Sequence, residues 1–162
     1  PPPRRRRLLP PGPREHLHAG SLEDASWIDR VRAFGPRPRL IIAEGVLMFV
    51  PRADVLTTLG RIAERLPGTR VVADVIGGLM VRCPWLHDTL PSTGVRFAWG
   101  LRRLEEPATW NPRIRLEAAH ALLLDGGPRW RWMRLLRPFP VMRRQFVLLE
   151  VRCGMPPDAG SG

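Results

Sequence analysis

The sequence predicts an α/β protein, and three features carry that prediction. Residues 39–43 and 69–76 are two short apolar runs, and residues 51–66 between them repeat apolar side chains at helical spacing. A strand, a helix and a strand with short connections form a βαβ unit, in which the strands are parallel and the crossover is right-handed. A further apolar strand, residues 145–152, follows late in the chain.

Both ends of the chain are poor in apolar residues. The opening PPPRRRRLLPPGPR combines fixed proline torsions with mutually repelling arginines, which opposes both helix and packed strand. We expect disordered tails over residues 1–15 and 156–162, with one portion of a domain over 16–155.

The first helix is expected just before the first strand. Ser21 offers an N-cap with acids following it, and apolar residues then recur at helical spacing until Gly35-Pro36. The strand 39–43 is a continuous apolar run bounded by Pro38 and Glu44, which is typical of a parallel strand covered on both faces.

The second helix and second strand complete the βαβ unit. Pro51 is placed as an early helix residue, the apolar stripe runs from Val55 to Leu66, and Pro67-Gly68 ends the helix. Beyond Gly77-Gly78 the pattern predicts these elements: a helix over 79–90, an irregular segment through Trp99 and Trp110, a strand or strand pair over 114–124, a helix over 130–136, and the strand 145–152.

Composition narrows the function classes. The net charge is +11, but all 26 basic residues are arginine, and residues 16–126 hold 14 arginines against 12 acids. Basic ends can bind nucleic acid by counterion release, yet no zinc-finger, helix-turn-helix or RNP-type motif accompanies them, which argues against that partner. No run reaches the roughly 18 apolar residues of a membrane span, and the two cysteines fit free thiols, so we expect a soluble, cytoplasmic protein.

Glu44 and Gly45 follow the first apolar strand directly. Ligands of open α/β sheets bind beyond the carboxyl ends of the strands, so this is where chemistry is expected. A carboxylate there suggests that a cation or several donors reach it. Capping of a loop, or an ion pair with an arginine, is the alternative explanation.

The segment LIIAEGVLMFVPRADVLTTLGRIAERLPGTRVVADVIG resembles the C-terminal part of class I S-adenosylmethionine-dependent O-methyltransferases of the leucine carboxyl methyltransferase and polyketide O-methyltransferase family. The shared pattern is a strand ending in Ala-Glu-Gly, then a proline-started helix, then Pro-Gly and a strand ending near an acid. AGSLEDASWIDRVRAFG and FAWGLRRLEEPATWNPRIRL are similar to two further regions of that family. The resemblance implies an incomplete Rossmann-like methyltransferase sheet, with parallel strands and a late antiparallel strand pair.

The resemblance also implies a cofactor site. Glu44 would accept the methionine ammonium of S-adenosylmethionine, with Gly45 beside it. Ser21 and Leu22 stand where the family has an Asp-Leu pair beside the adenine, so serine keeps an acceptor but loses the charge.

The acceptor site is less defined by the same resemblance. Phe49 stands where the family commonly has tyrosine, Asp74 matches the acid ending the next strand, and His87 lies in a segment able to line a substrate pocket. The implied acceptor is a carboxylate or hydroxyl of a small molecule. A carboxylate needs no base, so positioning and exclusion of water would carry catalysis. No Ser-His-Asp triad is needed and no metal site is expected, and the catalytic residues themselves stay unassigned.

One part of the family pattern does not occur in this sequence. Family members carry a strand with a Gly-x-Gly-x-Asp loop before the matched region, whereas the glycine pair here, Gly77-Gly78, follows a different strand. We therefore expect this chain by itself to bind the cofactor weakly. Three interpretations stay open: a fragment of an active methyltransferase, a non-catalytic remnant, or a basic nucleic-acid-binding protein.

Overall fold

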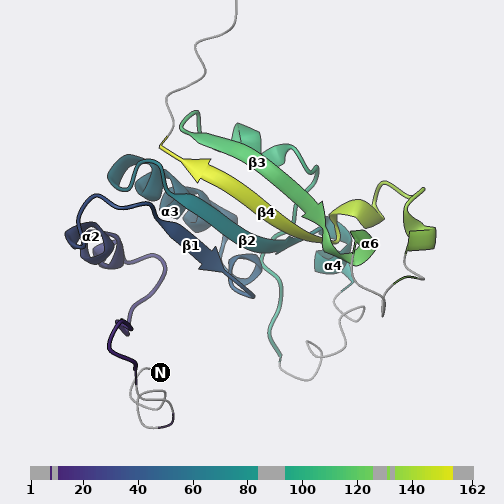
Figure 1. Cartoon of the computed structure of the whole chain (residues 1–162). Helices are drawn as coiled ribbons and strands as arrows, with labels where there is room; N and C mark the ends of the chain where they lie inside the picture. The colour runs from purple at the N-terminus through teal and green to yellow at the C-terminus, as the bar shows by residue number, and fades with distance from the viewer. Residues whose placement is uncertain (1–7, 9–10, 84–93, 126–130, 132–133, 155–162) are drawn as a thin grey trace, which may run out of the picture.

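The computed structural model describes residues 8, 11–83, 94–125, 131 and 134–154. These residues build a four-stranded sheet with the order β1-β2-β4-β3 (Figure 1). The strands are β1 (Leu40–Ala43), β2 (Arg70–Ile76), β3 (Ile114–Ala121) and β4 (Phe146–Cys153). The helices are α2 (Ser26–Ala33), α3 (Arg52–Arg65), α4 (Gly78–Arg82) and α6 (Leu122–Asp125), and the 3-10 helices are η1 (Leu47–Phe49), η3 (Glu106–Thr109) and η5 (Met142–Arg144).

The strand directions confirm the predicted fold class. Strand β1 pairs with β2 in parallel, from Leu40 opposite Arg70 to Ala43 opposite Ala73. Strand β4 pairs antiparallel with β2 on one side and with β3 on the other. The carboxyl ends of β1 and β2 therefore lie at the same end of the sheet, next to the beginning of β4.

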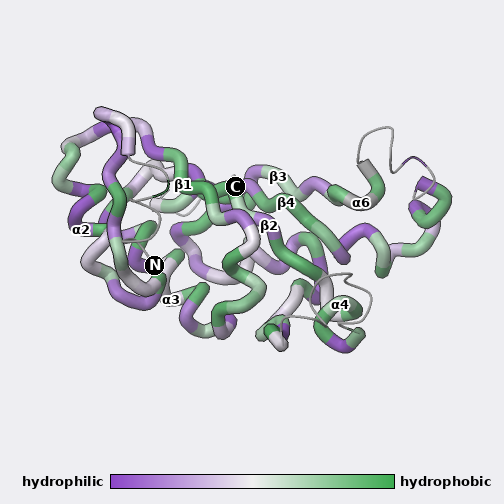
Figure 2. The backbone as a smooth tube through the Cα atoms, turned by 90° about the horizontal axis from the view of Figure 1, so that it is seen from below, coloured by the Kyte–Doolittle hydropathy of each residue, from purple (hydrophilic) through white to green (hydrophobic). Residues whose placement is uncertain are grey.

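The core lies between one face of the sheet and helices α2 and α3. The apolar stripe predicted for residues 51–66 supplies the helical side of this core, and alternate residues of β2 and β4 supply the sheet side. Figure 2 shows mainly green, apolar stretches along β2 and β4. Members of the cluster include Val55, Leu59, Ile62, Leu66, Val71, Ala73, Val75, Val147, Leu149 and Val151.

Helix α2 begins later than the sequence predicts. The expected cap, Ser21, forms only a local turn in which its Oγ accepts the Glu23 N–H at 3.3 Å. Asp24 accepts both the Ser26 N–H at 2.9 Å and the Ser26 hydroxyl at 2.8 Å, so the chain turns once more before the helix starts. The predicted end is confirmed, because Gly35 has φ +84° and donates to the Arg32 carbonyl.

The prediction that β1 is covered on both faces is wrong. Strand β1 is the edge of the sheet that the described residues form, and Leu40 and Ile42 are 58% and 67% exposed. Ile41 and Ala43 pack against the core, so only one face is buried. An unbroken apolar run cannot distinguish one-sided from two-sided burial, because that depends on which other elements pack against the strand.

The remaining predicted elements are confirmed in part. Strand β3 is single, and a short helix, α6, replaces the strand expected after residue 121. Helix α4 forms the start of the helix expected over 79–90, but residues 84–93 lie outside the described part of the chain. Of the helix expected over 130–136, residues 131 and 134–136 are described and are 3-10 helical, whereas residues 130, 132 and 133 lie outside the described part.

Two further findings concern the lengths of the helices and the state of the two cysteines. None of the helices that the structure describes is long and apolar enough to cross a membrane. Cys83 and Cys153 are free thiols, and burial raises the pKa of the Cys153 thiol to about 12.

Candidate functional site

The turn after β1 is fastened to the neighbouring strand β2. The Gly45 N–H donates to Oδ1 of Asp74 at 2.7 Å, and Gly45 has φ +64°, a conformation that suits glycine. Glu44 is exposed at the carboxyl end of β1. Within the described residues no hydrogen bond or ion pair engages its carboxylate, so the alternative explanation, an ion pair with an arginine, is not seen there. Asp74 thus positions the turn that carries Glu44.

The next residues of this turn contact a segment from much later in the chain. The Trp99 indole N–H donates to the Leu47 carbonyl at 2.8 Å, and the Ala98 N–H donates to the Met48 carbonyl at 2.8 Å. Phe49 stacks on Phe97 with ring centroids 5.4 Å apart. These contacts hold η1 and residues 97–99 side by side at the carboxyl end of the sheet.

Ser21 and Leu22, which were also expected at the cofactor site, lie in the segment before α2. The Leu22 carbonyl accepts from the Trp27 indole at 3.4 Å and from the Thr58 hydroxyl at 3.5 Å, so Leu22 joins the segment before α2 to α3. Among the bonds of the described residues, none joins Ser21 or Leu22 to the Glu44 turn. His87 lies outside the described residues.

A cleft of about 740 Å³ opens beside the carboxyl end of β2, and we call it the arginine cleft. Gly78, directly after β2, and Leu101, which donates its N–H to the Ile76 carbonyl at 2.7 Å, lie in its wall. Its size falls within the range of small-molecule sites. Its charged lining residues are Arg52, Arg82, Arg102, Arg103, Arg144 and Glu106.

Among the residues that the structure describes, Glu106 is the one acid in the lining of the arginine cleft. It receives the Arg52 guanidinium at 2.9 Å and the Arg102 backbone N–H at 2.8 Å. Burial by itself would raise the pKa of Glu106, but these two donors together hold the pKa below its usual value. Glu106 is therefore ionised and already engaged at neutral pH.

Because the pKa of Glu106 is lowered in the folded state, its ionised carboxylate should stabilise the protein in a way that depends on pH. The contribution is present above the ordinary pKa of 4.5 and is lost as the pH falls through the lower pKa of the folded state. We expect Glu106→Gln to flatten the fall in the free energy of unfolding below pH 4.5, measured by urea titration at a series of pH values. Glu105→Gln, at an exposed neighbour, is the matched control, and an equal flattening in the control would contradict the prediction.

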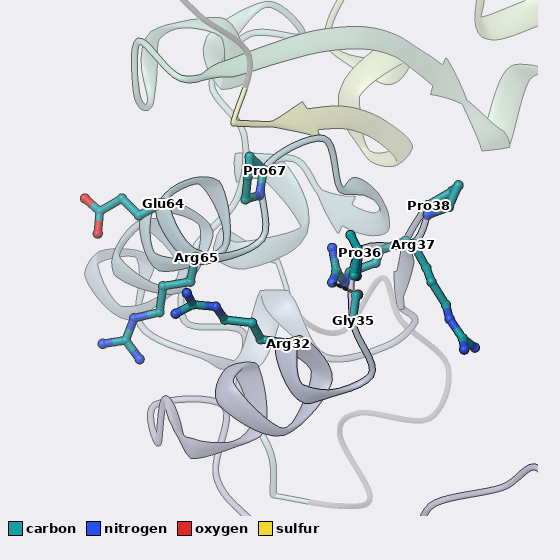
Figure 3. Close-up of a pocket in the computed structure, with 9 residues that line it drawn as sticks. Arg32, Gly35, Pro36, Arg37, Pro38, Glu64, Arg65 and Pro67 are labelled. Carbon is teal, nitrogen blue, oxygen red and sulfur yellow. Dashed lines mark hydrogen bonds between the residues drawn. The ribbon is translucent and has the colours of Figure 1, made fainter.

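A second cleft, of about 660 Å³, lies at the opposite end of the strands (Figure 3). Arg39 and Pro67, which precede β1 and β2, line it together with Arg32, Arg37 and Arg65. Two of these side chains are already engaged: Arg39 with the Gly35 carbonyl, and Arg65 with Asp29 at 3.2 Å. Ligands of open α/β sheets bind at the carboxyl ends of the strands, so this cleft is not the candidate active site.

Sequence reasoning missed the arginine cleft. Its five arginines come from four separate places between residues 52 and 144, and no spacing within the sequence links them. The uniform use of arginine across the whole chain hides any local signal. Trp99, in the wall of this cleft, belongs to a segment for which the sequence predicts only irregular structure.

Comparisons with known proteins support the resemblance that the motifs indicate. No protein-family model matches the chain. The chain is 26% identical over 152 residues to the tetracenomycin polyketide synthesis O-methyltransferase TcmP of Streptomyces glaucescens, covering 90% of this chain and 56% of that protein. The chain therefore spans little more than half the length of this curated relative.

A solved structure confirms the fold. A DUF574 family protein from Streptomyces avermitilis superimposes with a TM-score of 0.56 at 14% identity, covering 92% of this chain and 60% of that one. The likeness, together with the parallel and antiparallel pairing of the four strands, confirms a mixed α/β fold with a partial Rossmann-like sheet. In this chain, the Glu44 turn and the arginine cleft both lie at the carboxyl ends of the parallel strands β1 and β2.

Proposed function

We propose that this chain belongs to an S-adenosylmethionine-dependent O-methyltransferase acting on a carboxylate or hydroxyl of a small molecule. The observation that carries the proposal is the similarity to TcmP, which extends over 90% of the chain. The similarity includes the turn in which an acid and a glycine follow a parallel strand, and ligands of such sheets bind at that position.

The residues at this turn fit the proposed cofactor. S-adenosylmethionine would supply a methyl group that passes from its sulfonium sulfur to a substrate oxygen, with the neutral thioether as the leaving group. Glu44 offers a carboxylate without an ion pair among the described residues, which suits the ammonium of a methionine tail. Asp74 holds the Gly45 N–H and so fixes the direction of the turn. Phe49, stacked on Phe97, gives the turn an aromatic border.

The test joins this chain to the part of TcmP that lies outside the matched region. If the proposal is right, the folded hybrid protein binds S-adenosylmethionine in calorimetry with micromolar affinity, and this chain by itself binds it at least about a hundredfold more weakly. A hybrid whose circular dichroism shows a folded α/β protein, but which binds no cofactor, would favour the non-catalytic remnant instead.

Glu44→Ala in that hybrid is expected to raise the dissociation constant for S-adenosylmethionine about tenfold or more, which is about 1.4 kcal/mol. The reason is the loss of a charge-assisted hydrogen bond to the ammonium. Calorimetry measures the change, and Glu64→Ala, an exposed acid beside the second cleft, is the matched control. An unchanged dissociation constant would remove Glu44 from the site.

A further inference from the structure

The segment that leads into β4 carries positive charge that no neighbouring acid in the sequence balances. Between Asp125 and Glu150 the sequence has six arginines and no acid. We call residues 134–143 of this stretch the basic protrusion. Arg134 and Arg143 are exposed, and neither has a hydrogen-bond or ion-pair partner within the described part of the chain. Such an excess of charge favours an anionic partner.

The basic protrusion also exposes large apolar side chains. Leu135 is 79% exposed and Phe139 is 56% exposed, and Leu135 is the most exposed large hydrophobic residue among those that the structure describes. Single exposed apolar residues are common at protein surfaces. Two of them within five residues, on a segment that is otherwise strongly basic, indicate a contact surface instead.

The backbone of the basic protrusion is folded into successive hydrogen-bonded turns. Three backbone N–H groups donate within it, with N···O distances of 3.1, 3.0 and 2.9 Å: Arg137 to Arg134, Phe139 to Leu136 and Met142 to Phe139. Pro138 and Pro140 flank Phe139, and each proline fixes its own φ. The exposed side chains are therefore presented by a backbone that is already ordered, so binding through them costs little further conformational entropy.

The basic protrusion stands away from the sheet. Figure 1 and Figure 2 both show it beyond α6, at the right of the picture. A convex surface of this kind is not a pocket for a small molecule, because such pockets are concave. Its partner is therefore an extended anionic surface.

The combination of side chains favours lipid over nucleic acid as that surface. At an anionic bilayer, arginines contact headgroup phosphates while apolar side chains enter the boundary of the acyl chains. Nucleic acid would also accept the arginines and could stack a base on Phe139, but it offers no apolar medium for Leu135.

From these observations we propose that the basic protrusion binds the surface of an anionic lipid membrane, with Leu135 and Phe139 inserted among the lipids and Arg134 and Arg143 on the headgroup phosphates. The binding is peripheral and needs no membrane-spanning helix. It does not depend on the proposed function, because none of these residues belongs to the Glu44 turn and no cofactor takes part.

The first experiment measures co-sedimentation of this chain with two kinds of vesicle, one of phosphatidylcholine and one of equal parts of phosphatidylcholine and phosphatidylglycerol. We expect at least about tenfold tighter binding to the anionic vesicles, because several arginines act together there. Equal binding to both vesicles, or no binding to either, overturns the proposal. Tighter binding to a short DNA duplex, at the same concentration of phosphate, would assign the surface to nucleic acid and would also overturn it.

The second experiment tests insertion of the apolar side chains without changing the charge. Leu135→Ser with Phe139→Ser should weaken binding to the anionic vesicles about tenfold or more, because burial of both side chains is lost. Phe34→Ser with Ile42→Ser is the matched control, since these residues are 52% and 67% exposed but lie outside the basic protrusion. The control should change binding less than about twofold. Unchanged binding of the Leu135 and Phe139 variant, or an equal loss in the control, would refute insertion.

The third experiment compares two double variants with the same change in charge. Arg134→Gln with Arg143→Gln should weaken binding to the anionic vesicles about tenfold or more. Arg32→Gln with Arg37→Gln, in the second cleft, should change it less than about twofold. An equal loss in both would mean that only the overall charge matters, and would overturn the proposal. Urea denaturation verifies that every variant is folded, which is expected because the Leu135 and Phe139 side chains and those of all four arginines are mainly in water.

Discussion

Gly77→Ala is expected to destabilise the protein by about 3 kcal/mol or more, because its side chain would meet backbone rather than a movable side chain. A Cβ at Gly77 would lie within van der Waals overlap of the Arg144 carbonyl oxygen and 2.8 Å from the side-chain amide of Gln145. Gln145 is itself buried and accepts the Met80 N–H at 3.2 Å, so it has little room to move.

The neighbouring glycine provides the control. A Cβ at Gly78 would meet nothing within 4 Å, and Gly78 is the first residue of α4, so Gly78→Ala should change the free energy of unfolding by less than about 1 kcal/mol. Urea denaturation of both variants measures the difference. Equal stability of the two variants would show that β2 and the segment before β4 do not approach each other as the structure has them.

Leu101→Ala is the second change with a large expected effect, a loss of about 2–5 kcal/mol in the free energy of unfolding. Leu101 is 0% exposed and belongs to the main core, so truncation would leave a cavity between the sheet and the wall of the arginine cleft. Its backbone is held between the end of β2 and the start of α4, since it donates to the Ile76 carbonyl and accepts the Gly78 N–H. The surroundings therefore cannot easily collapse into the cavity.

Leu135→Ala is the control for this truncation, because Leu135 is 79% exposed and loses little buried surface. Urea denaturation should show a lower midpoint for Leu101→Ala with an unchanged slope, and no measurable shift for Leu135→Ala. A loss below about 1 kcal/mol at Leu101 would contradict the core assignment.

The glycine pair shows how far sequence reasoning reaches. The sequence was enough to separate Gly77-Gly78 from a nucleotide-binding loop, because the pair follows the second strand of the βαβ unit. Why Gly77 must be glycine is visible only in three dimensions. The backbone before β4, more than sixty residues later, passes against it.

The Glu44 turn could be predicted from the sequence, whereas its contact with β2 could not. Glu44, Gly45 and Phe49 are neighbours in the chain, so the strand and the turn after it could be predicted from the pattern. Asp74 was expected at the end of the next strand, but its bond to the Gly45 N–H depends on the register of β1 against β2. Ser21 was assigned to the cofactor by resemblance alone, and the structure shows it in a local turn before α2.

The sequence by itself determined the order of the elements, the parallel direction of β1 and β2 and the position of Glu44, because apolar periodicity and short connections are local properties of the chain. Only the tertiary structure decided that β1 is half-exposed and that arginines from four segments line one cleft. Burial on a strand's second face, and the convergence of distant side chains, depend on which elements pack together. That choice is made by the whole fold and leaves no local pattern.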